Sequence, residues 1–182
     1  MRRLSYFLAA LLLAYSGQLF SSASKLPKVI THPSGIVFKL CSQQKITKAL
    51  FFDIVKVGLY YPSCTGKLSV FDNNNKLLRF HYLRKVTGKQ FKEGAEEYLT
   101  HNLSESEHEK CFDKYQNINA SYTDVDEGDY YDLYHLQSIG LDLLLNNKPK
   151  AKFQNPFCES LYFNIWFGKK SMSSDFKKLL GH

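Results

Sequence analysis

The chain contains one run, Ala49-Leu-Phe-Phe-Asp-Ile-Val-Lys-Val-Gly-Leu-Tyr-Tyr61, from which its architecture can be inferred. The run is too apolar, and too rich in β-branched and aromatic side chains, for a strand with one face in water. It predicts a central strand that is covered on both faces and ends at Pro62, where the backbone lacks a donor. We therefore expect a sheet in which this strand is internal.

The segments on either side of this run have the alternation of ordinary strands. Residues 35–41 alternate between two kinds of side chain and predict a strand, and residues 78–83 predict a half-buried one. Residues 42–45 are polar and are interpreted as a turn before the central strand. Residues 72–75, Asp-Asn-Asn-Asn, predict a second turn.

An amphipathic helix is predicted where the period changes, from Thr87 onward. Thr87 is a candidate N-cap because its hydroxyl can accept a backbone hydrogen bond. After it, charged side chains lie on one helix face and apolar ones on the other. The apolar face consists of Phe91, Ala95, Tyr98 and Leu99. A second, more polar helix is predicted for residues 104–115.

The last third of the chain predicts hairpin strands followed by short helices. Residues 126–129 are interpreted as a turn into a strand over 130–136, and residues 146–149 as a turn between strands at 141–145 and 150–153. A buried helical turn and a short capped helix close the chain, marked by Leu161, Ile165, Trp166, Gly168 and Ser173 or Ser174. This order of elements indicates an α+β fold with a mainly antiparallel sheet.

The first residues have the three parts of a secretory signal peptide. Two arginines precede an apolar stretch at residues 4–15, and small residues at 21–23 suit a signal peptidase. A membrane anchor is the weaker alternative, because about 20 apolar residues are needed to span a bilayer. We expect a signal peptide at residues 1–23, one domain at residues 24–182 with no membrane span, and export to the periplasm or the medium.

The charge of the chain argues against nucleic acid as a partner. The formal net charge is +7, and it falls to +5 without Arg2 and Arg3 because residues 1–23 contain no acidic residue. The remaining cations are scattered along the chain, whereas nucleic-acid binding needs a concentrated basic stripe or a recognition motif. The chain also has no nucleophile elbow, phosphate-binding glycine loop or zinc-protease motif. No cofactor is expected.

The cysteine count predicts two structural disulfides. An even number of widely spaced cysteines is typical of proteins that fold in an oxidising compartment. The four residues are Cys41, Cys64, Cys111 and Cys158, and their pairing stays open. A metal site formed by His101, His108 and Cys111 is the competing interpretation, but the short spacing of zinc ligands is missing.

Two short sequences could carry a modification. Asn102-Leu-Ser104 and Asn119-Ala-Ser121 match the acceptor pattern for N-glycosylation, which matters only if the source is a eukaryote.

Aromatic side chains are abundant, with 12 Tyr and 14 Phe. They occur on several consecutive predicted strands and on the helix expected to cover them. Such a distribution fits a mostly apolar ligand cleft with a few polar groups, and it also fits an ordinary packed core. The sequence leaves both interpretations open.

The order of these signals resembles the chalcone isomerase-like family, particularly its exported bacterial members. The resemblance rests on the central strand 52–60, the segment 80–87 that leads into the first helix, Gly128-Asp129, the Asn146-Asn147 turn and the ending 163–181. Together these cover about residues 34–181. The resemblance implies an open-faced β-sandwich, in which a large antiparallel sheet is covered by a layer of helices with a ligand cleft between them.

The enzymatic branch of this family uses an Arg, a Thr, a Tyr and an Asn around the cleft. Alignment on residues 58–60 and on the helix from Gly88 places Gln43 or Gln44, Val55, Phe91 and Tyr98 at these positions. A neutral amide cannot replace a guanidinium, and Val or Phe cannot replace a hydroxyl donor, in stabilising a developing charge. The resemblance therefore implies a non-catalytic protein, with no catalytic residue assigned.

Another branch of the family binds fatty acids without catalysis, using a cation and a Tyr near the carboxylate. By this resemblance, the candidate ligand-binding residues are Arg84, Lys56, Tyr82 and Tyr98. The expected function is to bind a hydrophobic small molecule such as a fatty acid. Two alternatives stay open: an enzyme with a rearranged cleft, and a structural or protein-interaction domain without a ligand. The oligomeric state is not indicated by the sequence.

Overall fold

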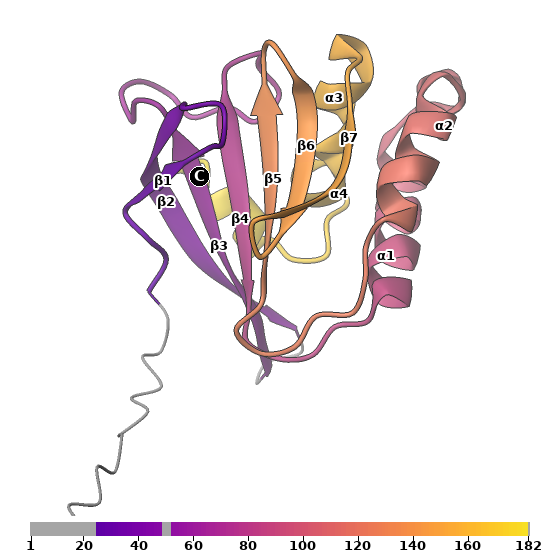
Figure 1. Ribbon diagram of the computed structural model, residues 1–182. Coiled ribbons are helices and arrows are strands. Elements are labelled where there is room, and N and C mark those ends of the chain that lie inside the picture. The colour runs from indigo at the N-terminus through magenta and orange to yellow at the C-terminus, as the bar shows by residue number, and fades with distance from the viewer. Residues whose placement is uncertain (1–24, 49–51, 182) are drawn as a thin grey trace, which may run out of the picture.

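A computed structural model describes residues 25–48 and 52–181 of the chain (Figure 1). The predicted signal peptide lies outside these residues, as do the first three residues of the run 49–61. No helix in the described residues is long and apolar enough to cross a membrane.

Within these residues the chain forms one seven-stranded antiparallel sheet in which every strand pairs with its neighbours along the sequence. The strands are β1 (Val29–Thr31), β2 (Val37–Lys48), β3 (Phe52–Tyr61), β4 (Lys76–Tyr82), β5 (Tyr130–Leu136), β6 (Gly140–Leu145) and β7 (Lys148–Phe153). The helices are α1 (Gly88–Asn102), α2 (Glu105–Ala120), α3 (Pro156–Tyr162), α4 (Asn164–Phe167) and α5 (Asp175–Lys178). The predicted α+β class is confirmed.

The internal strand β3 is covered on both faces over its second half. Val57 and Leu59 belong to the large core cluster on the helix side, whereas Tyr60 belongs to a smaller cluster on the other side. Gly58 also faces this second side, where a Cβ atom would meet the Tyr60 ring at 2.5 Å and Leu26 at 3.0 Å. A side chain at this position would therefore collide with the Tyr60 ring first, and also with Leu26 from the segment before β1.

The polar residues 42–45 continue strand β2, so the predicted turn there is wrong. They pair with β3 in register, with bulges between Leu40 and Ser42 and between Ile46 and Thr47. Their backbone groups are satisfied by β3, and the Gln43 side chain is exposed. Because pairing fixes this segment, polarity alone did not indicate its conformation.

Strand β4 is buried more completely than its alternation predicted. Only His81 of its seven residues is partly exposed. Its polar position Arg79 is covered because the guanidinium is paired with the buried carboxylate of Asp132 on β5, with N–O distances of 2.7 and 2.6 Å. A paired charge can occupy a site that a single charge cannot.

Helix α1 begins after Thr87, the predicted N-cap, and α2 begins after Ser104, the first residue of the range predicted for the second helix. The side chains of Thr87 and Ser104 each accept a hydrogen bond from the backbone of the third residue of their helix, and the side chain of that residue accepts one from the backbone N–H of the cap. Ala95 and Leu99 form the buried part of α1, as predicted. Helix α2 extends to Ala120, beyond the predicted end at Tyr115.

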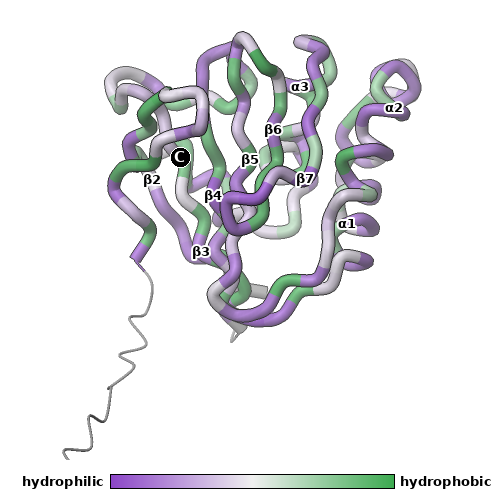
Figure 2. Tube along the Cα trace, in the orientation of Figure 1, coloured by the Kyte–Doolittle hydropathy of each residue, from purple (hydrophilic) through white to green (hydrophobic). Residues whose placement is uncertain are grey.

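Helices α1 and α2 form a pair that stands on one side of the sheet, and Figure 2 shows both with mixed hydropathy, as expected for helices with one face in water. The two connections to the sheet, residues 83–87 and 121–129, run side by side (Figure 1). Val86 and Val125 exchange both backbone hydrogen bonds across them. The helix pair thus leaves and rejoins the sheet at one place, between the adjacent strands β4 and β5.

The four cysteines pair as Cys41–Cys64 and Cys111–Cys158. The first disulfide joins β2 to the segment after β3, and the second joins α2 to α3. Cys111 is therefore not available as a metal ligand, and residues 25–48 and 52–181 contain no cluster of three or more potential metal-binding side chains.

The asparagines of both glycosylation sequons are not accessible for glycosylation in the folded protein. The Asn102 amide donates hydrogen bonds to the carbonyls of Tyr98, Asn164 and Lys170. Asn119 is buried, with 1% of its surface exposed. An oligosaccharide on either residue would require local unfolding.

Candidate functional site

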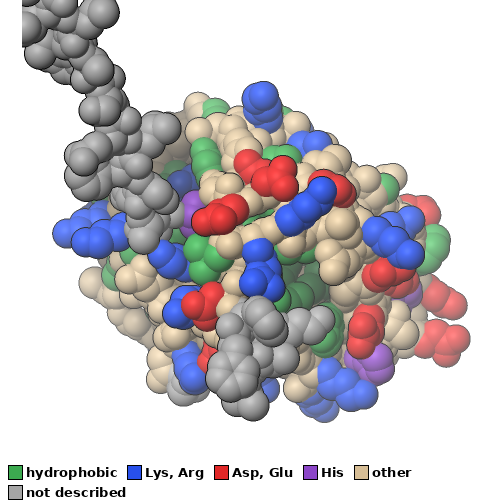
Figure 3. Space-filling model, turned by 90° about the horizontal axis from the view of Figure 1, so that it is seen from below, with side chains coloured by type: hydrophobic (Ala, Val, Ile, Leu, Met, Phe, Trp, Pro, Cys, Tyr) green, Lys and Arg blue, Asp and Glu red, His purple; other side chains and the backbone are tan. Residues whose placement is uncertain are grey.

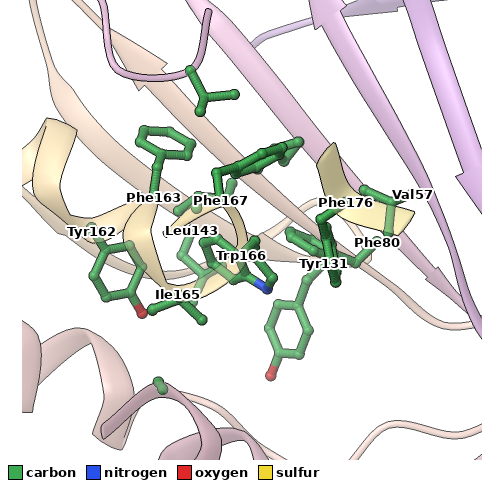
Figure 4. Packing of buried hydrophobic residues seen from close by; sticks show 14 of the residues in the cluster. Val57, Phe80, Tyr131, Leu143, Tyr162, Phe163, Ile165, Trp166, Phe167 and Phe176 are labelled. Carbon is green, nitrogen blue, oxygen red and sulfur yellow. The ribbon is translucent and has the colours of Figure 1, made fainter. Parts of the chain in front are cut away.

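Aromatic side chains lie on the side of the sheet that faces the helices, and Figure 4 shows part of this buried cluster, including Tyr131, Tyr162 and Trp166. Phe91 on α1 lies 5.4 Å from Tyr82 on β4 and 5.3 Å from Tyr122, measured between ring centroids. Tyr122 in turn lies 5.0 Å from Tyr131 on β5. We call this set the aromatic layer; it consists of Tyr82, Phe91, Tyr115, Tyr122, Tyr131, Phe153, Tyr162 and Trp166.

Hydroxyl groups lie within this apolar layer. Figure 4 shows the hydroxyl oxygens of Tyr131 and Tyr162 on the same side of the cluster. The Tyr131 hydroxyl accepts a hydrogen bond from the Thr123 backbone at 2.9 Å. The Tyr162 hydroxyl donates one to Oδ1 of Asn119 at 2.8 Å. The layer is therefore apolar with a few fixed polar points, as small-molecule sites usually are.

Burial keeps these hydroxyls neutral. It raises the pKa of Tyr82 and Tyr162 well above the ordinary tyrosine value, because a phenolate would lose its hydration. Burial raises the pKa of Tyr122 as well. The tyrosines can thus donate hydrogen bonds at neutral pH, but they are poor proton acceptors.

One buried donor in the layer has no partner. The side-chain nitrogen Nδ2 of Asn119 makes no hydrogen bond with any residue in the described part of the chain. The assignment follows from Oδ1 accepting from Tyr162, and an amide turned the other way would instead leave a buried oxygen without a donor. An unsatisfied buried polar atom costs about 1–3 kcal/mol, so its presence suggests a role beyond packing.

A surface groove of about 650 Å³ lies beside Asn119, between the first turn of α1 and the last turn of α2. We call it the α1–α2 groove; it is lined by Gly88, Lys89, Lys92, Asn119, Ala120, Tyr122, Thr123 and Asp124. Its volume is within the range of about 300–1,000 Å³ typical of small-molecule sites. Figure 3 views the lower end of the molecule, where side chains of both charges surround hydrophobic ones.

Two of the four predicted ligand-binding residues belong to the helix side of the sheet. Tyr82 is buried in the aromatic layer and packs edge-to-face against Phe91. Tyr98 is half-buried on α1, one turn after Ala95, and packs against the core cluster. Tyr82 is therefore part of the aromatic layer, whereas Tyr98 packs against the same core cluster from α1 without belonging to the layer.

Lys56 lies on the other face of the sheet. Side chains alternate along a strand, and its neighbours Val55 and Val57 both face the helices. Directly opposite Lys56 on the neighbouring strands are Lys45 and His81. This placement separates Lys56 from Tyr82 and Tyr98 by the thickness of the sheet.

Arg84 is exposed at the lower edge of the sheet, two residues after β4 ends. It lies near Asp53, whose pKa is lowered by hydrogen bonds from Lys45 and Thr47 and further by the charges of Lys45 and Arg84. Arg84 is thus exposed after the end of β4 and is not part of the aromatic layer.

The positions aligned with the catalytic residues of chalcone isomerases mostly surround the aromatic layer. Gln44 pairs with Val57 on the helix side, whereas Gln43 pairs with Gly58 and faces away, so Gln44 is the relevant residue. Val55 pairs with Tyr82, and Phe91 packs on the same ring. The layer is therefore lined with apolar rings and an amide where the aligned pattern has charged and hydroxyl groups.

A buried ionic network at the other end of the sheet was not anticipated from the sequence. The Lys76 ammonium group donates to the carbonyl of Asp72 at 2.6 Å and lies 2.9 Å from the Asp72 carboxylate. His135 lies beside Lys76, at 3.5 Å, and its Nε2 is 3.1 Å from Oε2 of Glu159 on α3. All these groups have partners, so we assign the network to holding α3 against the sheet.

Comparison with known families identifies the fold. The family model described as chalcone isomerase-like matches residues 46–181. The chain belongs to the chalcone isomerase-like family. Among solved structures, the crystal structure of an Arabidopsis thaliana fatty-acid binding protein matches with a TM-score of 0.56 and 10% sequence identity, over 84% of this chain and 95% of that one. A comparison with curated proteins finds no match.

The sequence resemblance is thus confirmed for family and fold. In this chalcone isomerase-like protein, Asn119 and the α1–α2 groove are the features that sequence reasoning missed. A signal for Asn119 was present, because Cys111, Tyr115, Ile118 and Asn119 follow one helical face. Extending the second helix beyond Tyr115 would have placed Asn119 on its buried side.

Proposed function

We propose that this chalcone isomerase-like protein binds a hydrophobic small molecule, such as a fatty acid, between its helix pair and its sheet. The observation that carries the proposal is the buried Asn119 donor without a partner, at the edge of a layer of aromatic rings. A ligand oxygen would satisfy this donor, and an acyl chain would pack on the rings. The fatty-acid binding protein of the same fold supports this choice of ligand class.

The energetic balance permits such a ligand. Burying one CH₂ group contributes about 0.8 kcal/mol, so about twelve carbons contribute roughly 10 kcal/mol. Association costs about 4–15 kcal/mol in lost translational and rotational freedom. Apolar contact alone can therefore offset much of the cost, and polar contacts would mainly set the orientation of the ligand.

The proposal is for binding without catalysis, in an exported protein. The positions aligned with the catalytic set carry Gln44, Val55, Phe91 and Tyr98, and the neutral tyrosine hydroxyls offer no base for proton abstraction. Export is supported by the arrangement of residues 1–23 and by the two disulfides, which persist in oxidising compartments.

Native mass spectrometry of the protein purified from cells tests this function. We expect an added mass that solvent extraction and lipid analysis identify as a long-chain acyl compound. Ala95→Leu, which extends a buried side chain of α1, should lower the occupancy of the ligand. Gly94→Ala on the same helix is the matched control, since its new Cβ would meet no atom within 4 Å.

The proposal fails if no ligand copurifies and added dodecanoate neither binds in calorimetry nor raises the melting temperature. In that case the aromatic layer is part of the packed core, and the protein is a structural or interaction domain without a ligand. An Ala95→Leu variant that keeps full occupancy would place the ligand elsewhere on the protein.

A further inference from the structure

We infer that the α1–α2 groove holds the carboxylate of the acyl ligand, with Lys89 and Lys92 supplying charge and Asn119 a hydrogen bond. The inference rests on the proposed function and adds the site and the chemistry of the head group. It replaces Arg84 and Lys56, the cations suggested by the family resemblance, with residues of the helix pair.

The first support is the unpaired amide. Asn119 lines the groove, is 1% exposed, and has its Oδ1 occupied by the Tyr162 hydroxyl. This bond fixes the amide, and its buried Nδ2 has no acceptor among the described residues. A preorganised buried donor gains most from an oxygen that carries negative charge.

The second support is the charge of the groove. Lys89 and Lys92 are three residues apart on α1, so both line the same wall. Among the described residues, Lys89 forms an exposed ion pair with Glu93 at 3.6 Å, and such a surface pair contributes little. Both lysines also line a neighbouring hollow together with Glu93, Glu96 and Glu97, so an anion in the groove competes with these exposed carboxylates for the two cations.

One carboxylate of the protein also lines the groove, and it is already engaged. Asp124 Oδ1 accepts a hydrogen bond from the Gly88 backbone at 2.9 Å, and its Oδ2 lies 3.8 Å from the Lys85 ammonium group. The first backbone N–H of α1 thus already serves this carboxylate, and a ligand carboxylate would rely on the two lysines and Asn119.

The dipole of α1 also contributes to the electrostatic potential in the groove. The groove lies at the positive end of the α1 dipole, where anions are favoured. The first turn of α1 contains no acidic residue, in contrast to α2, whose first turn carries Glu105 and Glu107. The first turn of α1 thus adds no carboxylate of its own, and Asp124, from outside the helix, is the carboxylate that accepts a hydrogen bond from its first N–H.

The groove also leads to the aromatic layer. Tyr122 lines the groove, and its ring stacks on Phe91, which contacts Tyr82 on the sheet. An acyl chain whose carboxylate lies at Lys92 would therefore meet apolar rings at once. Because these rings are packed on each other, the chain reaches the sheet only by parting the Phe91–Tyr122 stack.

Calorimetry with a matched pair of probes, dodecanoate and 1-dodecanol, tests the inference. In the full-length mature protein, Lys89→Gln/Lys92→Gln should weaken dodecanoate about ten-fold or more, the worth of contacts to a charged group. Its effect on 1-dodecanol should stay within about two-fold, since apolar burial is unchanged. Lys169→Gln removes one exposed charge beyond the C-terminal end of α1 and should affect neither probe.

Two further variants separate the alternatives. Asn119→Asp replaces the donor with an acceptor and should weaken dodecanoate more than 1-dodecanol, with the melting temperature recorded to monitor folding. Arg84→Gln tests the competing cation and should leave the acid-to-alcohol affinity ratio unchanged.

The possible results are distinct. Equal losses for both probes in the double lysine variant, or an acid-specific loss in Arg84→Gln alone, would overturn the groove assignment and leave the proposed function standing. If neither probe binds the unaltered protein, the proposed function fails and the head-group site fails with it.

Discussion

The guanidinium of Arg79 donates a hydrogen bond to each carboxylate oxygen of Asp132, at N–O distances of 2.7 and 2.6 Å. Both side chains lie on the face of the sheet opposite the helix pair. Both side chains are buried, and the Arg79 guanidinium also lies 4.1 Å above the ring of Tyr130. The pair links the central strands β4 and β5 on the side opposite the aromatic layer.

Removing one partner of this ion pair should lower the unfolding free energy more than replacing both partners with apolar residues. Asp132→Ala leaves a buried guanidinium without a partner and should destabilise the protein by about 3–5 kcal/mol. Arg79→Met/Asp132→Leu removes both charges and should cost much less, or even stabilise the fold. Urea unfolding of the three proteins measures the differences. Equal destabilisation of the single and double variants would show that the pair is needed for the register of the strands.

The disulfides should contribute unequally to stability. The mature protein is expected to begin near Ser24 and to contain both bonds. Intact mass before and after reduction and alkylation tests this.

The variant Cys111→Ser/Cys158→Ser should lose about 2–5 kcal/mol of unfolding free energy. Its closed loop spans 47 residues against 23 for Cys41–Cys64, so its loss should cost about 0.6 kcal/mol more by loop closure. The reverse order would indicate that unfolded-state entropy does not govern these bonds.

The buried network at His135 should make the fold sensitive to mild acid. Burial, together with the charge of Lys76, lowers the pKa of His135 below its ordinary value of about 6.5. Between the folded and unfolded pKa values the unfolded chain binds more protons, so stability is complete above about pH 6.5 and falls as the pH drops. One such group gives a slope of up to about 1.4 kcal/mol per pH unit.

Stability curves from pH 7.5 to 5 will measure this slope. His135→Gln should flatten it, because the variant no longer has a group that must stay neutral in the folded state. His81→Gln is the comparison: burial lowers the pKa of His81 too, but its side chain is partly exposed. A wild-type slope that survives in His135→Gln would assign the acid sensitivity to other groups.

Removing both partners of the Asn119–Tyr162 hydrogen bond should preserve the stability of the fold but weaken the binding of dodecanoate. Asn119→Leu leaves the Tyr162 hydroxyl without its acceptor and should cost about 1–3 kcal/mol. Asn119→Leu/Tyr162→Phe removes both polar groups together with the unpaired donor, and should be within about 1 kcal/mol of the unaltered protein or more stable. The double variant should also bind dodecanoate less tightly. Destabilisation equal to the sum of the separate Asn119→Leu and Tyr162→Phe changes would show that the two side chains do not stabilise each other.

The protein should not cyclise naringenin chalcone faster than the spontaneous reaction. The residues aligned with the family's catalytic positions include Val55 and Phe91, which cannot donate hydrogen bonds to a developing charge. Absorbance changes with and without the protein measure the rate. A saturable acceleration that persists in Tyr82→Phe would show that the alignment is in error and that a different set of groups acts.

The sequence indicated those parts of the fold in which one segment determines its own environment. The run ending at Tyr61 is apolar on both sides, which is sufficient to predict β3 as an internal strand. Residues with hydroxyl side chains, Thr87 and Ser104, precede the two long helices, so the starts of both helices could be predicted locally. The polar segment 42–45 became a strand because β3 pairs with it, which is a property of two segments. For the same reason the cysteine pairing could not be inferred, since it depends on α2 lying beside α3.

The candidate site was only partly accessible from the sequence. The two-residue period of β3 already places Lys56 on the face opposite Val55 and Val57, so its separation from Tyr82 could have been inferred. The groove could not, because it forms where the beginning of one helix meets the end of another. Asn119 becomes significant only through what surrounds it.

The place where the helix pair joins the sheet bears on how the molecule folds. Residues 83–129 leave the end of β4 and return to the start of β5, so they are an insertion within what is otherwise a hairpin. The other strand pairings of the meander join segments close in sequence, which favours rapid formation with low contact order. We expect the meander to assemble as one unit and the inserted helices to dock afterwards, with oxidation of Cys111 and Cys158 as the step that fastens them.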